Sequence, residues 1–272
     1  MKKKHLKKIT ENPDFIPNIY NYCDRWCERC SFTSRCENYA LSKKNFTDSE
    51  SRNINNHIFW QNMAEVFELP LDILKEVAKQ EGIELDILDT KTTTKKTYRD
   101  IAKNHECSRL AMIYGEMVDN WFKLAEGLFD EKEHILNIKI RLGILDADTD
   151  TAAEAAVLND AVDIICWYQH QIYVKLMRAI QGDIEEKSEH QDRFPRDSHG
   201  SAKIALIAMD RSIAAWEKMG KLFPEQKDNI LDILLHLDRL RRKTEEAFPA
   251  ARAFVRPGFD TIDPNSKPLS FL

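Results

Sequence analysis

Four of the six cysteines lie within one stretch, Cys23-Asp24-Arg25-Trp26-Cys27-Glu28-Arg29-Cys30-Ser31-Phe32-Thr33-Ser34-Arg35-Cys36. Their spacing is C-x3-C-x2-C-x5-C. Thiolates are soft metal ligands, and four of them so close together in a chain are typical of a metal centre. The stretch therefore predicts a four-cysteine metal clip near the N-terminus, with Cys23, Cys27, Cys30 and Cys36 as the ligands.

Two kinds of cofactor suit this ligand set. An iron–sulfur cluster, usually [4Fe–4S], is held by four cysteine thiolates. A structural zinc ion also takes four cysteines, but such sites are usually built from two C-x2-C pairs well separated in the sequence, and this chain has one such pair, Cys27 and Cys30. The spacing favours a [4Fe–4S] cluster and leaves one Zn2+ as the alternative.

The segment from Cys27 to Cys36 resembles the cluster loop of the endonuclease III and adenine glycosylase family, which ends in C-x2-C-x5-C and holds a [4Fe–4S] cluster. The first spacing is x3 where that family has x6, and no helix-hairpin-helix glycine motif accompanies the loop. The resemblance therefore implies a cluster type and no base-excision activity. The first three cysteines also match the radical-SAM signature. However, Arg29 stands where that family usually has an aromatic residue, and the sequence does not indicate its alternating strands and helices.

Three arginines, Arg25, Arg29 and Arg35, alternate with the cysteines. A cluster held by four thiolates carries a net negative charge, so guanidinium groups beside it would offset that charge and raise its reduction potential. A solvated basic rim is the alternative interpretation. We expect Trp26 and Phe32 to pack the clip against the helices and to shield it from water.

The composition indicates a helical protein. The 272 residues include only 8 Gly and 9 Pro, whereas folds built from many tight turns need more of both. Apolar periodicity predicts long helices over residues 98–128, 151–181, 201–221 and 226–246, with shorter helices over 48–81 packed beside them. The expected fold is all-α, an antiparallel helical bundle. Residues 1–46 form the basic segment with the clip, and residues 47–272 form the bundle with an extended C-terminal tail.

The predicted helix over 151–181 suggests a second site. It is apolar nearly all round, which predicts burial, yet it carries Asp163 and His170 on one stripe. A buried carboxylate or imidazole must be paired, hydrogen-bonded or metal-bound. These two residues are therefore either part of a satisfied polar network or the centre of a buried site, metal-binding or acid–base, in an enzyme of unknown reaction.

Charge and missing motifs limit the possible functions. Residues 1–44 hold ten Lys or Arg and five Asp or Glu, while the remainder holds 30 and 40, so a large nucleic-acid footprint is not expected. No apolar run approaches the ~20 residues of a membrane span, and no export signal is visible, so we expect a cytoplasmic protein. P-loop, Rossmann and Gly-x-Ser-x-Gly motifs are missing from the sequence. A redox role would require a redox protein partner, while the sequence indicates neither the substrate nor the oligomeric state.

Overall fold

The computed structural model describes residues 12–45, 90–142, 151–188 and 197–260, and within these ranges it is helical without any strand. The all-α prediction is confirmed. The helices predicted over 48–81 lie outside the described residues. In chain order the elements are η1 (Ile19–Tyr22), η2 (Cys27–Arg29), η3 (Thr33–Arg35), α2 (Glu37–Asn45), α5 (Thr90–Asn104), α6 (Glu106–Leu142), α7 (Thr151–Ser188), α8 (Asp197–Leu222), η4 (Pro224–Gln226) and α9 (Lys227–Ala247).

The chain divides into two compact units. The N-terminal unit comprises residues 1–94 together with 256–272, and the helical unit comprises residues 95–255. The sequence analysis places one boundary at residue 46 and keeps the C-terminal tail with the bundle. In this division the C-terminal segment belongs with the N-terminal residues instead. The link is a side-chain contact in which the Phe259 ring packs edge-on against the Phe32 ring, with centroids 5.1 Å apart.

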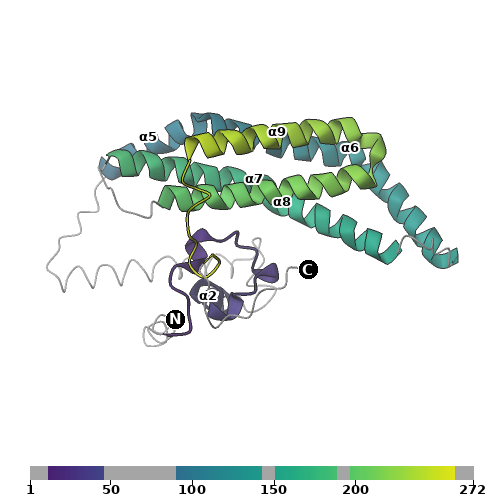
Figure 1. Ribbon diagram of the computed structural model, residues 1–272, viewed down its shortest axis with the longest axis horizontal. Helices are drawn as coiled ribbons and strands as arrows, with labels where there is room; N and C mark the ends of the chain where they lie inside the picture. The colour runs from purple at the N-terminus through teal and green to yellow at the C-terminus, as the bar shows by residue number, and fades with distance from the viewer. Residues whose placement is uncertain (1–11, 46–89, 143–150, 189–196, 261–272) are drawn as a thin grey trace. The chain divides into compact units, whose positions relative to one another are not determined.

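The four longest described helices make up the helical unit (Figure 1). Helix α6 packs against α7 and α9, and α8 packs against the same two helices, so the contacts form a closed cycle around one core. Helix α8 faces this core with many small residues, which let neighbouring helices approach closely. Its buried small residues are Ser198, Gly200, Ser201, Ala202, Ala205, Ala208, Ser212 and Ala215.

Three described segments are helical beyond the bounds predicted from apolar periodicity. Helix α5 begins at Thr90, ahead of the helix predicted from residue 98, while α6 runs on from residue 128 to Leu142 and α7 from residue 181 to Ser188. The physical reason in α7 is local pairing, because the Lys187 ammonium lies 2.6 Å from the Asp183 carboxylate one turn away. The Glu186 carboxylate also accepts hydrogen bonds from the amide and hydroxyl of Ser198, at 3.1 and 2.7 Å, at the start of α8.

The segment after α9 turns rather than running extended as predicted. Phe248 and Phe254 are buried in the helical unit, and the Lys203 ammonium donates to the Phe254 carbonyl at 2.6 Å. The Arg252 guanidinium pairs with the carboxylates of Asp210 and Glu245. These contacts tie the segment to α8 and α9 and explain why it is rich in apolar and basic residues.

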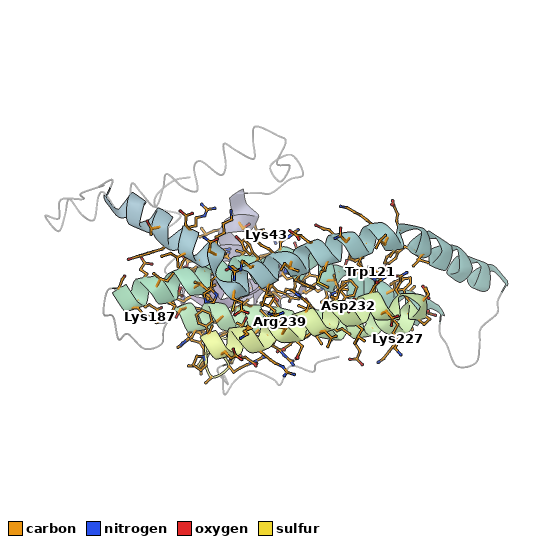
Figure 2. The ribbon with its side chains drawn as sticks, turned by 90° about the horizontal axis from the view of Figure 1, so that it is seen from above. Lys43, Trp121, Lys187, Lys227, Asp232 and Arg239 are labelled. Atoms are coloured by element: carbon orange, nitrogen blue, oxygen red, sulfur yellow. The ribbon has the colours of Figure 1, made fainter. Side chains whose placement is uncertain are left out.

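An aromatic cluster fills the core between α6 and α8. Trp121 packs edge-on against Trp216 and Phe223, with ring centroids 5.1 and 5.8 Å apart, and Figure 2 shows it between the helices. The Trp216 indole N–H donates to the Tyr114 hydroxyl at 3.2 Å. Tyr114 is completely buried, and this burial raises the pKa of its phenol to about 12. The hydrogen bond thus joins α6 and α8 where water has no access.

No helix in the described ranges is both apolar enough and long enough to cross a lipid bilayer.

We predict that Tyr114→Phe lowers the free energy of unfolding by about 1–3 kcal/mol, because it leaves a buried indole N–H without its acceptor. Urea unfolding followed by circular dichroism measures this loss. Tyr173→Phe, at a half-buried position on α7, is the matched control and should change stability little. Equal effects of the two substitutions would contradict the assigned role of the Tyr114 hydroxyl.

The wild type and Tyr114→Phe should respond differently to alkaline pH. Because the Tyr114 pKa is about 12 in the folded chain and about 10 when unfolded, only the unfolded chain releases this proton as pH rises through 10. The Tyr114 phenol therefore lowers the free energy of unfolding of the wild type above pH 10. Tyr114→Phe has no phenol to ionise and does not show this loss. We expect the stability deficit of the variant to shrink between about pH 9 and about pH 11 in parallel urea titrations. A constant deficit would show that the phenol is not shielded from solvent.

Candidate metal centre

Three short 3-10 turns position the four cysteines. Cys27 opens η2 and Cys30 follows it, while Cys23 follows η1 and Cys36 follows η3. Each turn is closed by backbone hydrogen bonds, such as Cys30 N–H to Cys27 O at 3.2 Å. Tight i to i+3 turns reverse the chain over a few residues, so the spacing x3, x2, x5 returns each cysteine to the same side of the loop.

The loop between Cys23 and Cys27 has a defined shape. The Asp24 carboxylate accepts the Trp26 amide at 3.2 Å, a side-chain turn typical of Asp, and the Cys27 amide donates to the Arg25 carbonyl at 3.0 Å. Arg25 between them has φ +59°, in the left-handed region that residues with a Cβ rarely adopt. The loop therefore holds one arginine in an unfavourable conformation between two of the predicted ligands.

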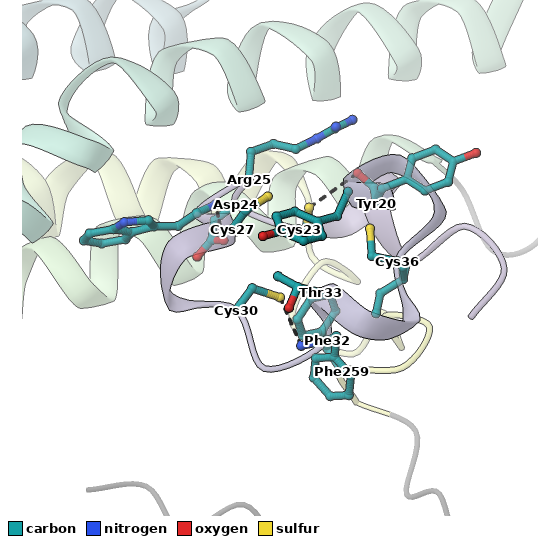
Figure 3. Close-up of a pocket in the computed structure, with 13 residues that line it drawn as sticks. Tyr20, Cys23, Asp24, Arg25, Cys27, Cys30, Phe32, Thr33, Cys36 and Phe259 are labelled. Carbon is teal, nitrogen blue, oxygen red and sulfur yellow. Dashed lines mark hydrogen bonds between the residues drawn. The ribbon is translucent and has the colours of Figure 1, made fainter. Parts of the chain in front are cut away.

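All four cysteines line one pocket of the N-terminal unit. The pocket is partly open to solvent, and the thiol-bearing side chains surround it (Figure 3). Each of the four is half-buried. The remaining lining is largely aromatic and apolar and consists of Ile19, Tyr20, Asp24, Arg25, Trp26, Phe32, Thr33, Tyr39 and Phe259.

Two thiols in this pocket, those of Cys27 and Cys30, resist ionisation. Burial, followed by repulsion from Cys23 and the other two cysteines, raises the pKa of Cys27 to about 11. Burial also raises the pKa of Cys30, although the Phe32 amide opposes this by donating to its sulfur at 3.4 Å. The groups are thus close enough for one thiolate to disfavour the next, and a cation placed among them would remove that penalty.

The three arginines of the stretch are held in different ways. Arg25 lines the pocket, with its guanidinium 5.9 Å from the centre of the Tyr20 ring. The Arg29 guanidinium stacks 4.1 Å over the Trp26 ring, and the Arg35 side chain donates to the Asp14 carbonyl at 3.4 Å. Of the three, only Arg25 is among the residues that line the pocket.

Among the described residues, no group of three or more His, Cys, Asp or Glu side chains stands in a geometry that would hold a metal ion. The four cysteines share a pocket without forming a preassembled coordination shell. Because ligands must lose their protons to bind a metal, the final approach of the sulfurs is expected to accompany binding.

The predicted burial of Asp163 and His170 is wrong, because both side chains are exposed. Each lies two residues before a buried isoleucine, Ile165 or Ile172, and two residues are about 200° around a helix. The polar residues that α7 does bury include the neighbouring Gln169, whose amide donates to the Gly115 carbonyl at 3.0 Å and to Asp119. The reason given for a buried second site is therefore removed.

Sequence reasoning missed two elements of the pocket, the aromatic walls from Tyr20 and Tyr39 and the distant Phe259. The apolar run near the C-terminus with its Pro257-Gly258-Phe259 turn indicated that this segment packs, but not where it packs. Contacts across more than two hundred residues leave no local pattern in a single sequence.

No protein-family model, curated protein or solved structure matches the chain. Functional inference therefore rests on the residues and geometry described above.

We predict that the backbone at Arg25 is strained. Arg25→Gly and Arg25→Ala both remove the guanidinium, but only glycine adopts positive φ without cost. The cysteine loop of the glycine variant should therefore open less often than that of the alanine variant. In the metal-free proteins, the thiols of the glycine variant should react with a thiol reagent about fivefold more slowly than those of the alanine variant. Carrying out the comparison in a Cys166→Ser background removes the exposed thiol of α7. Equal labelling rates would contradict a left-handed Arg25.

Proposed function

We propose that the protein binds a [4Fe–4S] cluster through Cys23, Cys27, Cys30 and Cys36 and uses it in a redox or sensing role. The observation that carries this proposal is that these four residues, spread over η1 to η3, line a single pocket. The fold that we propose around this site is an antiparallel helical bundle carrying a four-cysteine clip.

The lining of the pocket agrees with a cluster. The four cysteines share the pocket with several aromatic rings. An apolar shell around a cluster limits water access and so tunes its potential. A zinc ion, which four thiolates bind at about 2.3 Å and close around, is the alternative at the same ligands.

The electrostatics of the pocket are also suited to a cluster. The Phe32 amide directs its N–H at the Cys30 sulfur, which stabilises negative charge there, and hydrogen bonds to the sulfurs are among the factors that set cluster potentials. Arg25 provides a positive charge at the wall of the same pocket. Both groups support the thiolate form that metal binding requires.

Such a centre has two uses that agree with these features. In electron transfer the cluster would pass single electrons to a redox protein partner. In sensing, its assembly or loss would report on iron or on an oxidant, and the half-buried cysteines are accessible enough for this role. Zinc at the same ligands would instead make the pocket a structural staple of an interaction module.

Metal and sulfide analysis of anaerobically purified protein tests the proposal. We expect about four irons and four sulfides per chain and a broad absorption band near ~400 nm that bleaches on reduction. Cys36→Ser should lose most of this band and part of the iron. Cys166→Ser, which changes an exposed cysteine of α7, is the matched control and should keep both.

Two outcomes would overturn the proposal of a [4Fe–4S] cluster at these cysteines. One zinc per chain and no colour would assign the pocket to a zinc staple. Full iron content in Cys36→Ser together with loss in Cys166→Ser would place the metal elsewhere.

A further inference from the structure

We propose that the C-terminal segment Arg256–Asp260 belongs to the metal site, with Phe259 as the side chain that shields the bound metal from solvent. This inference rests on the proposed function in so far as a metal occupies the cysteine pocket, but it does not depend on which metal that is. Phe259 is here a positioning and shielding residue, since its ring offers no metal ligand.

The first observation is where the Phe259 ring lies. It lines the pocket together with the four cysteines and packs edge-on against Phe32, with ring centroids 5.1 Å apart (Figure 3). Phe32 is the residue whose amide donates to the Cys30 sulfur. The Phe259 ring therefore forms part of the pocket wall and packs against the residue whose backbone amide holds one of the proposed ligands.

The second observation is that the neighbouring position accepts only glycine. Gly258 has φ +76°, and a Cβ there would lie 2.9 Å from Ile16 Cδ1 and 3.0 Å from Ile19 Cδ1. Ile19 is only 2% exposed and also lines the pocket, so it has little freedom to move away. Both the backbone conformation and the lack of space exclude a side chain, which indicates that the segment packs directly on the layer beneath the pocket.

The third observation is that the segment is held closed by its own contacts. The Arg256 guanidinium binds the Asp260 carboxylate at 2.8 Å, and the Arg256 amide donates to the same carboxylate at 2.9 Å. Both side chains are largely buried, at 17% and 23% exposure, so solvent weakens the pair less than it would on the surface. The guanidinium also lies 4.9 Å from the centre of the Phe259 ring. The ring is thus fixed between Phe32 and Arg256.

These contacts link metal binding to a segment more than two hundred residues away in the chain. A shielded pocket limits the entry of water and of competing ligands, so the bound metal leaves slowly while Phe259 is in place. Removing the ring should open the pocket without removing any ligand. The expected effect is therefore on the rate of metal release and on the potential, and not on the amount of metal bound.

The test compares Phe259→Ala with Phe254→Ala. Both delete a phenyl ring from the stretch that follows α9, but Phe254 is buried in the helical unit and does not line the pocket. Metal release from the full-length, metal-loaded protein is followed anaerobically with a colorimetric chelator, a ferrous chelator for iron or a pyridylazo dye for zinc. We expect Phe259→Ala to release metal about tenfold faster than wild type at unchanged stoichiometry. Phe259→Leu should recover part of the difference, and Gly258→Ala should behave like Phe259→Ala.

Phe254→Ala should lower the unfolding midpoint of the helical unit while leaving the release rate within about twofold of wild type. In an iron-loaded protein, Phe259→Ala should also raise the midpoint potential, because water stabilises the more negative reduced cluster. A purely structural role for Phe259 would not shift a potential.

Equal release rates for Phe259→Ala and wild type would overturn the inference, as would equal acceleration by Phe254→Ala. The metal found in the wild type decides the proposed function separately. If the wild type binds no metal, the proposed function fails, and reaction of the pocket cysteines with a thiol reagent becomes the readout. Faster labelling in Phe259→Ala than in Phe254→Ala would then still support shielding, and equal labelling would reject it.

Discussion

The N-terminal unit is governed by one electrostatic constraint. Four thiol groups share a half-buried pocket, and burial, followed by repulsion from the neighbouring cysteines, raises the pKa of Cys27 to about 11. A positive centre among the sulfurs removes that constraint, because every thiolate then faces a cation instead of another anion. The Phe32 amide acts in the same direction on the Cys30 sulfur, on a smaller scale. The local turns, the aromatic walls and the C-terminal segment all serve to keep the four groups around one space.

The helical unit is held by different forces. Its core is an aromatic cluster around Trp121, with the Tyr114 hydroxyl satisfying the only polar atom of the Trp216 side chain. The small side chains of α8 let the neighbouring helices approach closely. Its charged groups are mostly paired along the surface, as Arg252 is with Asp210. The described residues of this unit thus form a scaffold, and the concentration of reactive side chains is found in the N-terminal unit.

The sequence-based predictions succeeded where a pattern is local. Sparse glycine and proline and apolar periodicity indicated long helices, and α7, α8 and α9 lie where they were expected, α7 with a longer C-terminal end. The helix predicted over 98–128 is instead divided between α5 and α6, with a break at His105, and α6 runs on to Leu142. The predictions failed for Asp163 and His170, because α7 also carries apolar residues on its outer face, such as Val174 at 58% exposure. A helix that is apolar nearly all round does not reveal which side is buried. The stripe through Ile165 and Ile172 does reveal it, once its packing against α8 is known.

For the candidate site, the sequence alone predicted the ligand set, because soft thiols at a spacing of two to five residues are brought together by short turns that depend only on neighbouring residues. Tertiary structure decided what surrounds them. The aromatic walls, the ring of Phe259 among them, depend on contacts between residues far apart in the chain, and so does Gly258, which combines a positive φ with close contacts to the side chains of Ile16 and Ile19. The spacing of the cysteines indicates the candidate ligands, because short local turns bring residues that are close in sequence to one site. Shielding is a property of packing, and packing is settled only when the whole chain has folded.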